Sequence, residues 1–307
     1  MGKKYVTPFL PRGYHTMTGE MCSLSSWQSH FTNMFIELMI NRFKWKNLPD
    51  EIDPRYLELS LLTSGSVVFF WDYVKGWCAL QGAWSGLDDY FNPIDFHVVT
   101  PSGFSPNVTK EEGVLIWSNF TRTSDMPTIW LYADTMAELY VSAMVNTKGQ
   151  KHPIVVLVDE ESQRLTLENS YAKLDGNHPV VYLDRKANIH EAFTTIDARV
   201  PFVAPEIIKM AKELMNDLFQ WAGIRVHNNE KKANIHAPEQ RDKNAVTWQL
   251  RNRGLHARQL ACEQINKKFG DYLPLGQLEV EFDEEGIEAY VTDMKMSLGL
   301  GGEEDFE

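Results

Sequence analysis

Residues 43–58 read Phe-Lys-Trp-Lys-Asn-Leu-Pro-Asp-Glu-Ile-Asp-Pro-Arg-Tyr-Leu-Glu, and the prolines in this stretch set the boundary between two predicted helices. Upstream, apolar residues recur every three or four positions over 26–45, which predicts a helix with one buried face. Proline cannot continue a helix, so this one should end at Asn47-Leu-Pro-Asp. Proline is favoured in a first turn, so Asp53-Pro54 predicts a second, short helix that runs to about Leu62.

Residues 65–117 are predicted to form β structure. Ser66–Tyr73 and Trp77–Trp84 flank a short link and predict a hairpin. Two further β-rich runs, 96–100 and 114–117, are separated by a loop rich in Pro, Gly and Ser. We expect the tryptophans of this region to belong to the core rather than to a ligand site: Trp71, Trp77, Trp84 and Trp117.

Two longer amphipathic helices follow. The first is predicted over 128–146, and the second begins at Pro205 and ends at Gly223, so each should be about 27–29 Å long. One face of the second helix is apolar, and another carries polar residues that include Lys209, Lys212 and Glu213. Between the helices, 154–158 and 164–167 predict a second hairpin, and 180–183 predicts another strand. The helices can pack as an antiparallel pair with this β insert at one end.

The last part of the chain alternates between loop and helix. Residues 226–244 have no apolar periodicity, which predicts a loop. A helical pattern resumes at Ala245 and continues to Phe269-Gly270, 278–282 predicts a last strand, and the glycine-rich acidic residues from 299 onward predict a mobile tail. Helices mixed with small hairpins indicate an α+β fold.

Composition narrows the functional classes. The chain has 307 residues, of which 43% are hydrophobic, a composition typical of a globular protein. No apolar run is long enough to span a bilayer, and no signal peptide is expected. Three distant cysteines (Cys22, Cys78 and Cys262) predict a reducing compartment without a disulfide framework, each one a small buried hydrophobic residue.

The sequence lacks several common motifs for catalysis. The chain has no phosphate-binding loop of the G-x-x-x-x-G-K-[ST] type, and His190-Glu191 lacks the second histidine of a zinc helix. A nucleophile elbow has the pattern G-x-S-x-G, with serine in the third position, whereas in Gly82–Gly86 the serine is the fourth residue. We therefore expect a protein that is not an enzyme and that has no catalytic residues, no metal site and no cofactor.

Charge is unevenly distributed along the chain. The net charge is −12, which should repel nucleic acid on average. Residues 225–258, however, hold eight arginines and lysines against three acidic residues, so this stretch carries +5 and the rest of the chain −17. It is either a solvated basic surface or a loop that meets phosphates without reading bases. A weaker basic segment contains Lys3, Lys4 and Arg12, and a free tail is the simpler interpretation there.

Residues 43–58 also resemble the upper-collar (portal, head–tail connector) proteins of small short-tailed bacteriophages that prime replication with a terminal protein. Those proteins share the pattern W-x-N-L-P-x-x-I-x-P-x-x-L-E, followed by a similar aromatic hairpin. The likeness continues in order through 26–282, in three further motifs: Pro127-Thr128 with Ala137-Glu-Leu139, Asn229-Glu-Lys-Lys232, and Ala261-Cys-Glu-Gln-Ile-Asn266. Two departures are a less basic N-terminal segment and an acidic C-terminal strand.

The resemblance implies a portal-type subunit that assembles into a twelvefold ring around DNA. It implies a β-rich wing with the first long helix (1–124), a stem helix (125–149), a small β clip (150–204), a second stem helix (205–223), a tunnel loop (224–245), and a helical crown with the acidic tail (246–307). Twelve copies at −12 each carry −144 formal charges, which suits a channel wall to which DNA does not adhere.

The same resemblance implies partners and sites. The ring would sit in the virion at the portal vertex between head and tail, after assembly in the host cytoplasm, and would serve packaging and ejection of double-stranded DNA. Its other partners would be a packaging ATPase, major capsid and scaffold proteins, the lower-collar tail protein and, in some relatives, a packaging RNA. The resemblance implies DNA contacts at Lys231, Lys232, Arg241 and Lys243. It implies channel-lining positions at Lys209, Lys212 and Glu213, and contacts with RNA or the capsid at Lys3, Lys4 and Arg12.

One alternative from another functional class remains at this stage. A monomeric nucleic-acid-processing enzyme could use the basic stretch 225–258 to bind its substrate. The absence of paired carboxylates or a metal motif in that stretch argues against it.

Overall fold

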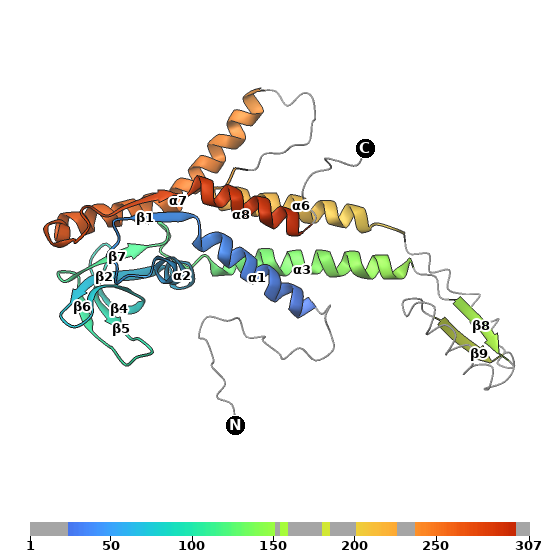
Figure 1. Ribbon diagram of the computed structural model, residues 1–307, viewed down its shortest axis with the longest axis horizontal. Coiled ribbons are helices and arrows are strands. Elements are labelled where there is room, and N and C mark those ends of the chain that lie inside the picture. The colour runs from blue at the N-terminus through green and yellow to red at the C-terminus, as the bar shows by residue number, and fades with distance from the viewer. Residues whose placement is uncertain (1–23, 151–153, 159–179, 185–200, 226–236, 299–307) are drawn as a thin grey trace.

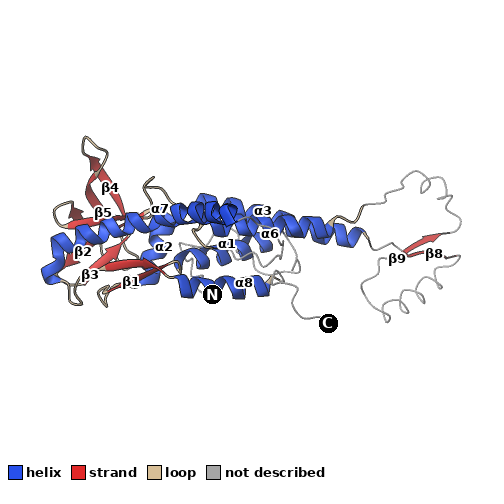
Figure 2. Ribbon diagram, turned by 90° about the horizontal axis from the view of Figure 1, so that it is seen from above, coloured by secondary structure: helices blue, strands red, loops and turns tan. Residues whose placement is uncertain are grey.

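A computed structural model describes residues 24–150, 154–158, 180–184, 201–225 and 237–298. The subunit is elongated (Figures 1 and 2). Helices α3 (Met126–Gly149) and α6 (Ala204–Trp221) run side by side along its length, with strands β8 and β9 beyond one end and the larger sheets at the other. The antiparallel pair with a β insert at one end, and the α+β class, are therefore confirmed.

Helix α1 (Leu24–Ile40) ends earlier than the sequence predicts. Residues 43–45, predicted as helix, belong to strand β1 (Phe43–Lys46), which pairs antiparallel with β10 (Glu279–Phe282). Phe43 pairs with Phe282 across the two strands, with ring centroids 5.9 Å apart. The apolar residues of β1 alternate with lysines, as a half-buried strand requires, so a partner distant in sequence overrides the local helical periodicity.

Helix α2 (Pro54–Ser64) confirms the second predicted helix. The Asp53 side chain accepts a hydrogen bond from the Arg55 backbone N–H at 2.9 Å and caps the first turn. Gly65 ends the helix in the left-handed conformation, with φ of 81°.

Two small sheets follow. The first contains β2 (Ser66–Asp72), β3 (Gly76–Leu80) and β7 (Gly113–Trp117) in the order β3-β2-β7, which confirms the predicted hairpin up to Leu80. The second contains β4 (Gly82–Leu87), β5 (Pro93–Val98) and β6 (Asn107–Thr109) in chain order. The predicted strand 77–84 is thus divided between two sheets.

The tryptophans of this region do not all belong to the core. Trp77 is buried and Trp117 half-buried, as expected, but Trp71 and Trp84 are 50% and 47% exposed. Trp71 lies at the hairpin end of β2, and Trp84 lies on β4, where the residues from Ala83 to Leu87 are exposed. The prediction that Trp71 and Trp84 belong to the core was wrong. Both lie where their sheets extend past the elements that pack against them.

The main apolar core lies between the long helices. Residues of α1, α3, α6 and α8 form one cluster, and the predicted apolar stripe of α6 contributes Ala211, Met215 and Leu218. At the end of the pair, the Asn146 side chain on α3 accepts hydrogen bonds from the Val203 and Ala204 N–H groups and donates one to the Pro201 carbonyl. This side chain fixes the start of α6 against the end of α3.

The β insert contains both predicted strands that lie in the described residues. Strand β8 (Ile154–Val158) pairs with β9 (Val180–Asp184), and the pairing is parallel. The expected hairpin partner, 164–167, lies outside the described residues. A parallel pair cannot be joined by a tight turn, so β8 and β9 do not form a hairpin with each other.

Helix α7 (Ala237–Phe269) begins eight residues before the predicted position, so the predicted loop is wrong over 237–244. In Figure 1 the first part of α7 rises away from α6, while its second part lies along the sheets. Apolar periodicity reports a buried face, and a helix that projects from the body needs none. The Ala, Glu, Gln, Arg and Lys residues there are good helix formers, and Pro238 fits a first turn.

Helix α8 (Glu284–Ser297) was not predicted. Asp283 caps its start by accepting a hydrogen bond from Gly286 N–H at 3.1 Å, and Ile287, Val291 and Met294 bury one face against the main core. Their spacing of four and three residues was visible in the sequence. None of the helices in the described ranges is both long and apolar enough to cross a membrane.

A buried ion pair joins α7 to the rest of the fold. Arg258 donates from Nε and Nη2 to the two carboxylate oxygens of Glu58 on α2, at 2.9 and 2.7 Å, and both side chains are 3% exposed. Trp45 Nε1 donates to the same carboxylate at 2.8 Å, and Arg258 Nη1 donates to the Ser118 carbonyl at 2.9 Å. One residue pair therefore links α2, β1, α7 and the segment that follows β7.

We expect Arg258→Met to lower the free energy of unfolding by about 3–5 kcal/mol, because it leaves the Glu58 carboxylate buried without its cation. The matched control is Arg55→Met. Arg55 approaches Asp53 to 3.8 Å on the surface of α2, and such an exposed pair is worth about 0–1 kcal/mol. Urea denaturation followed by tryptophan fluorescence measures both. Equal losses for the two variants would contradict the role assigned to Arg258.

Candidate nucleic-acid interface

The predicted DNA contacts occupy two different parts of the chain. Lys231 and Lys232 lie outside the described residues, as do Lys3, Lys4 and Arg12 of the weaker basic segment. Arg241 and Lys243 lie in the first turns of α7 rather than on a loop. At 1.5 Å per residue the two positions are about 3 Å apart along the helix axis, so a helix rather than a flexible loop sets their spacing.

The C-terminal part of the basic stretch serves the fold. Arg251 is buried, forms an ion pair with Glu284 on α8, donates from Nε to the Gly223 carbonyl at 3.0 Å and stacks 4.0 Å above the Phe282 ring. Arg253 contacts Asp125 at 3.4 Å and lies 5.6 Å from the centroid of the Trp221 ring.

A further arginine from outside the basic stretch joins this group. Arg42 donates to the carbonyls of Met39 and Ala222, and its guanidinium lies 5.0 Å from the Phe43 ring centroid. Burial, together with the nearby charge of Arg258, lowers the pKa of Arg42 to about 10, so it stays charged at neutral pH. Arg42, Arg251 and Arg258 are thus held by carbonyls, carboxylates and rings of the fold, which leaves them unavailable to phosphate.

The stem carries the predicted channel-wall residues on its surface. Lys209, Lys212 and Glu213 are all exposed, and their spacing places them on one side of α6, away from the apolar stripe that packs on α3. Exposed acids also lie on α3, at Asp134 and Glu138. The stem surface therefore presents both signs of charge rather than a continuous basic strip.

Lys212 also borders a cavity of about 700 Å³ near the far end of the stem. The cavity lies between the last turns of α3, with Tyr140 and Met144, and the start of α6, with Phe202 and Ile208. The Tyr140 hydroxyl is buried without a hydrogen-bond partner, and burial raises its pKa. The lining is mostly apolar and includes one charged residue, Lys212.

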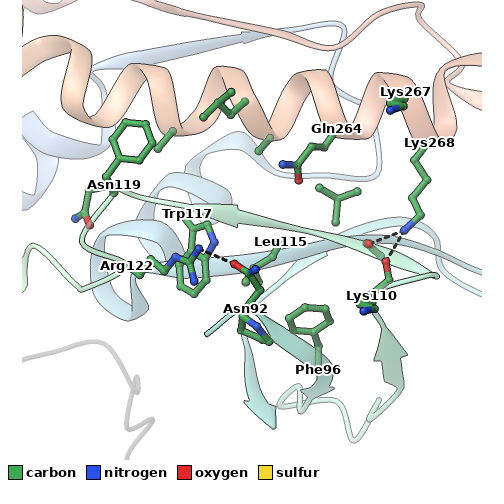
Figure 3. Close-up of a pocket in the computed structure, with 17 residues that line it drawn as sticks. Asn92, Phe96, Lys110, Leu115, Trp117, Asn119, Arg122, Gln264, Lys267 and Lys268 are labelled. Carbon is green, nitrogen blue, oxygen red and sulfur yellow. Dashed lines mark hydrogen bonds between the residues drawn. The ribbon is translucent and has the colours of Figure 1, made fainter. Parts of the chain in front are cut away.

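A basic groove that the sequence did not reveal lies between α7 and the two sheets (Figure 3). Its volume is about 760 Å³. Its charged residues come from three separate segments of the chain: Lys110, Arg122, and Lys267 with Lys268. No sequence window holds all four, so only the folded chain brings them together.

The groove holds its cations in fixed positions. Lys268 Nζ donates to the carbonyls of Lys110 and Gly113 at 2.6 and 3.0 Å, and burial lowers its pKa. Arg122 donates to the Phe91 carbonyl at 2.9 Å and to Asn92 Oδ1 at 2.8 Å, and stacks on Trp117 with 5.0 Å between guanidinium and ring centroid. These acceptors are all neutral.

Catalytic and metal-binding arrangements were sought among the described residues. In that part of the chain no group of three or more His, Cys, Asp or Glu side chains could hold a metal ion. Cys78 and Cys262 are buried, as expected, and burial raises their pKa to about 11 and about 12, which keeps them as unreactive thiols at neutral pH. Cys22 lies outside the described residues.

The chain was then compared with known proteins. A family model described as Phage Connector (GP10) matches residues 20–277. Among solved structures, a chain from "Portal and tail of native bacteriophage P68" is similar to this one, with 16% identity and a TM-score of 0.46. That match covers 91% of this chain and 94% of the other.

The family match spans most of the sequence, including the 43–58 pattern, both long helices and α7 up to its end. The resemblance drawn from the sequence motifs is thereby confirmed. The chain belongs to the phage connector family and is a head–tail connector protein of a bacteriophage.

Proposed function

We propose that twelve copies of this subunit form a portal ring at one capsid vertex. The ring is the channel through which double-stranded DNA is packaged and ejected, and it is the attachment point of the tail. Membership of the connector family supports a ring that contacts head and tail. The single observation that carries the proposal further is the elongated subunit, in which the α3–α6 pair extends from a broad β-rich wing (Figure 1).

The proposed partners follow from this position in the particle. They are other copies of this chain, double-stranded DNA, a packaging ATPase, the major capsid and scaffold proteins, the lower-collar tail protein and, where the phage uses one, a packaging RNA. Assembly would take place in the host cytoplasm before the ring enters the virion.

The stem surface supports self-assembly. Trp130 and Leu131 on α3 are 46% and 66% exposed, and Met210 on α6 is 55% exposed. Contiguous patches of exposed apolar side chains mark interaction surfaces, and we assign these three residues to the contact between subunits. A closed ring requires a heterologous interface, in which one face of a subunit meets a different face of the next.

Leu131→Asp should therefore weaken ring assembly. A carboxylate buried in an apolar interface lowers the association constant by more than tenfold. We therefore expect that at least a tenfold higher protein concentration is needed for half of the subunits to assemble. Mass photometry and electron microscopy measure the rings directly. The control is Val74→Asp on the turn between β2 and β3, which is 87% exposed and should leave assembly unchanged.

A sample of the unaltered chain that stays a ~35 kDa monomer at micromolar concentration would contradict the ring itself. Rings that form equally well with Leu131→Asp would exclude the α3 surface as the interface while leaving the ring intact.

The channel proposal concerns Lys231, Lys232, Arg241 and Lys243. In a ring they would form a cationic collar around the DNA. Single exposed contacts with phosphate are weak and exchange rapidly in salt, so such a collar would have little effect on the speed of transport. Many contacts acting together would resist back-slippage, and we assign the collar to retention of DNA in a filled head.

The test replaces charges rather than deleting 229–243, because the second half of that segment belongs to α7. Lys231→Gln with Lys232→Gln should leave ring assembly and early packaging intact, while filled heads lose their genome. The comparison is Lys209→Gln with Lys212→Gln on the stem, with a smaller expected loss. A packaging assay that measures DNA entry and DNA retention separately tests this expectation. Heads that keep full-length DNA without the two lysines would show that the collar has another role.

The competing function, a monomeric nucleic-acid-processing enzyme, predicts turnover by this chain alone. We expect a clean preparation to show no ATPase or nuclease activity above background. The connector family is a structural family, and the ATPase would be a separate protein. Activity that co-purifies with the chain and is abolished by one substitution within it would overturn this expectation.

A further inference from the structure

The groove between α7 and the sheets is the part of the molecule that the proposed function leaves without a role. Seventeen residues line it, and among them are four basic side chains and no carboxylate. This is unusual in a chain with 42 acidic and 30 basic residues. Its lining therefore selects for an anionic occupant.

Three acids lie near the groove but outside its lining, and two of them, Glu111 and Glu112, add negative charge near Lys268. Glu112 lies beyond the lining and accepts hydrogen bonds from the backbone N–H and the hydroxyl of Thr109, both at 3.0 Å. Asp88 accepts the backbone N–H groups of Tyr90 and Asn92 within its own turn. Glu111 is exposed and adds negative charge near Lys268 from outside the groove. None of the three occupies the space between Arg122 and Lys268.

The groove also has apolar and backbone surfaces. Phe96 and Leu115 lie between the basic ends in Figure 3, and Phe120, 56% exposed, completes one wall. Strand β7 contributes consecutive residues to the lining and is the edge strand of its sheet in the described fold. An edge strand offers backbone groups to an extended segment. Cations, an apolar wall and a strand edge together fit a short acidic peptide that carries an aromatic residue.

This chain contains such a segment. Residues 302–307 read Gly-Glu-Glu-Asp-Phe-Glu, with four carboxylates and one phenylalanine for the four cations and the apolar wall. The residues lie outside the described part of the structure, and their sequence alone carries the argument.

The segment cannot fill the groove of its own subunit. Arg251 meets Glu284 where α7 and α8 approach each other, and from there the second part of α7 and all of α8 run in opposite directions (Figure 1). At 1.5 Å per residue, α8 carries the chain about 21 Å one way, and the groove extends the other way from about 9 Å at Ala257 to about 24 Å at Lys267. The nine residues after Leu298 extend at most about 30 Å. Fully extended, they reach only the near end of the groove and fall short of the roughly 45 Å to Lys267 and Lys268.

We propose that the groove binds the acidic segment 302–307 of a neighbouring copy and so links adjacent subunits of the ring. The proposal rests on the proposed ring. It adds a contact between the wing of one subunit and the acidic segment of the next, distinct from the stem contact at Leu131.

The first test is a covalent link. Gln264→Cys in the groove and Phe306→Cys in the segment are combined in a chain whose Cys22 is serine, because Cys78 and Cys262 are buried. Mild oxidation should give a ladder of covalent oligomers on a denaturing gel. The control pairs Gln264→Cys with Thr292→Cys, an exposed position on α8 that should give none.

The second test does not require a ring. A labelled peptide with the sequence of 301–307 should bind a chain that ends at 301, and Lys110→Gln with Lys267→Gln should weaken this binding at least tenfold. Both lysines are exposed, so the substitutions should leave the fold intact. A peptide with alanine in place of Phe306 tests the apolar wall in the same way and should also bind more weakly.

The outcomes separate the two proposals. Rings seen by electron microscopy without a covalent ladder, or a link that stays within one chain, would overturn the inference and leave the ring intact. Absence of rings together with peptide binding would overturn the ring and the link between its subunits, and would leave the groove as a binding site for the acidic segment. A single-stranded oligonucleotide that displaces the peptide at equal charge, and that binds more tightly, would show that the groove is a nucleic-acid site, and the inference would then be wrong.

Discussion

The ion pair between Glu58 and Arg258 is the constraint on which the arrangement of the subunit depends. Two charges that are 3% exposed are tolerated only when every remaining hydrogen-bonding position is filled, because burial removes the water that would otherwise solvate them. Trp45, Ser118 and the guanidinium fork fill those positions, and each comes from a different element. A shift of α7 by one residue would break all of these contacts at once. The pair therefore contributes to a single register for α7 more than to raw stability.

The same constraint explains why charge counting overstates the nucleic-acid surface. Arg251, Arg253 and Arg258 belong to the basic stretch in sequence, yet in the fold they neutralise Glu284, Asp125 and Glu58. The close approach of Gly223 shows how tightly this region is built, since a Cβ there would lie 2.5 Å from the Arg251 Cα and the residue has φ of 77°. Arg225 is exposed, and the four residues of the channel proposal, Lys231, Lys232, Arg241 and Lys243, all precede these structural arginines in the chain.

The sequence predicted the structural features that depend on interactions between residues close together in the chain. The Asp53-Pro54 cap, the hairpin around Gly76 and the stripe of α6 each depend on residues within a few positions, and all three were found. Strand β1 was missed because its partner lies more than two hundred residues away. The first turns of α7 were missed because their sequence has no apolar periodicity. The basic groove was missed because its residues are also distant in sequence. Lys110, Arg122 and Lys267 become neighbours only after α7 packs on β7.

Arginine and lysine have different roles in this chain, one in the fold and the other in the proposed channel. The planar guanidinium binds two acceptors at once and stacks on rings, and Arg42, Arg251 and Arg258 use this geometry to hold Phe43, Phe282 and their carboxylate or carbonyl partners. Lysine is a compact, strongly hydrated charge that pairs with phosphate without a fixed geometry. Three of the four residues proposed to meet DNA are lysines. A wall of arginine forks would hold the phosphates in two-point contacts, whereas a wall of lysines would let the backbone slide while many weak contacts together still resist its escape.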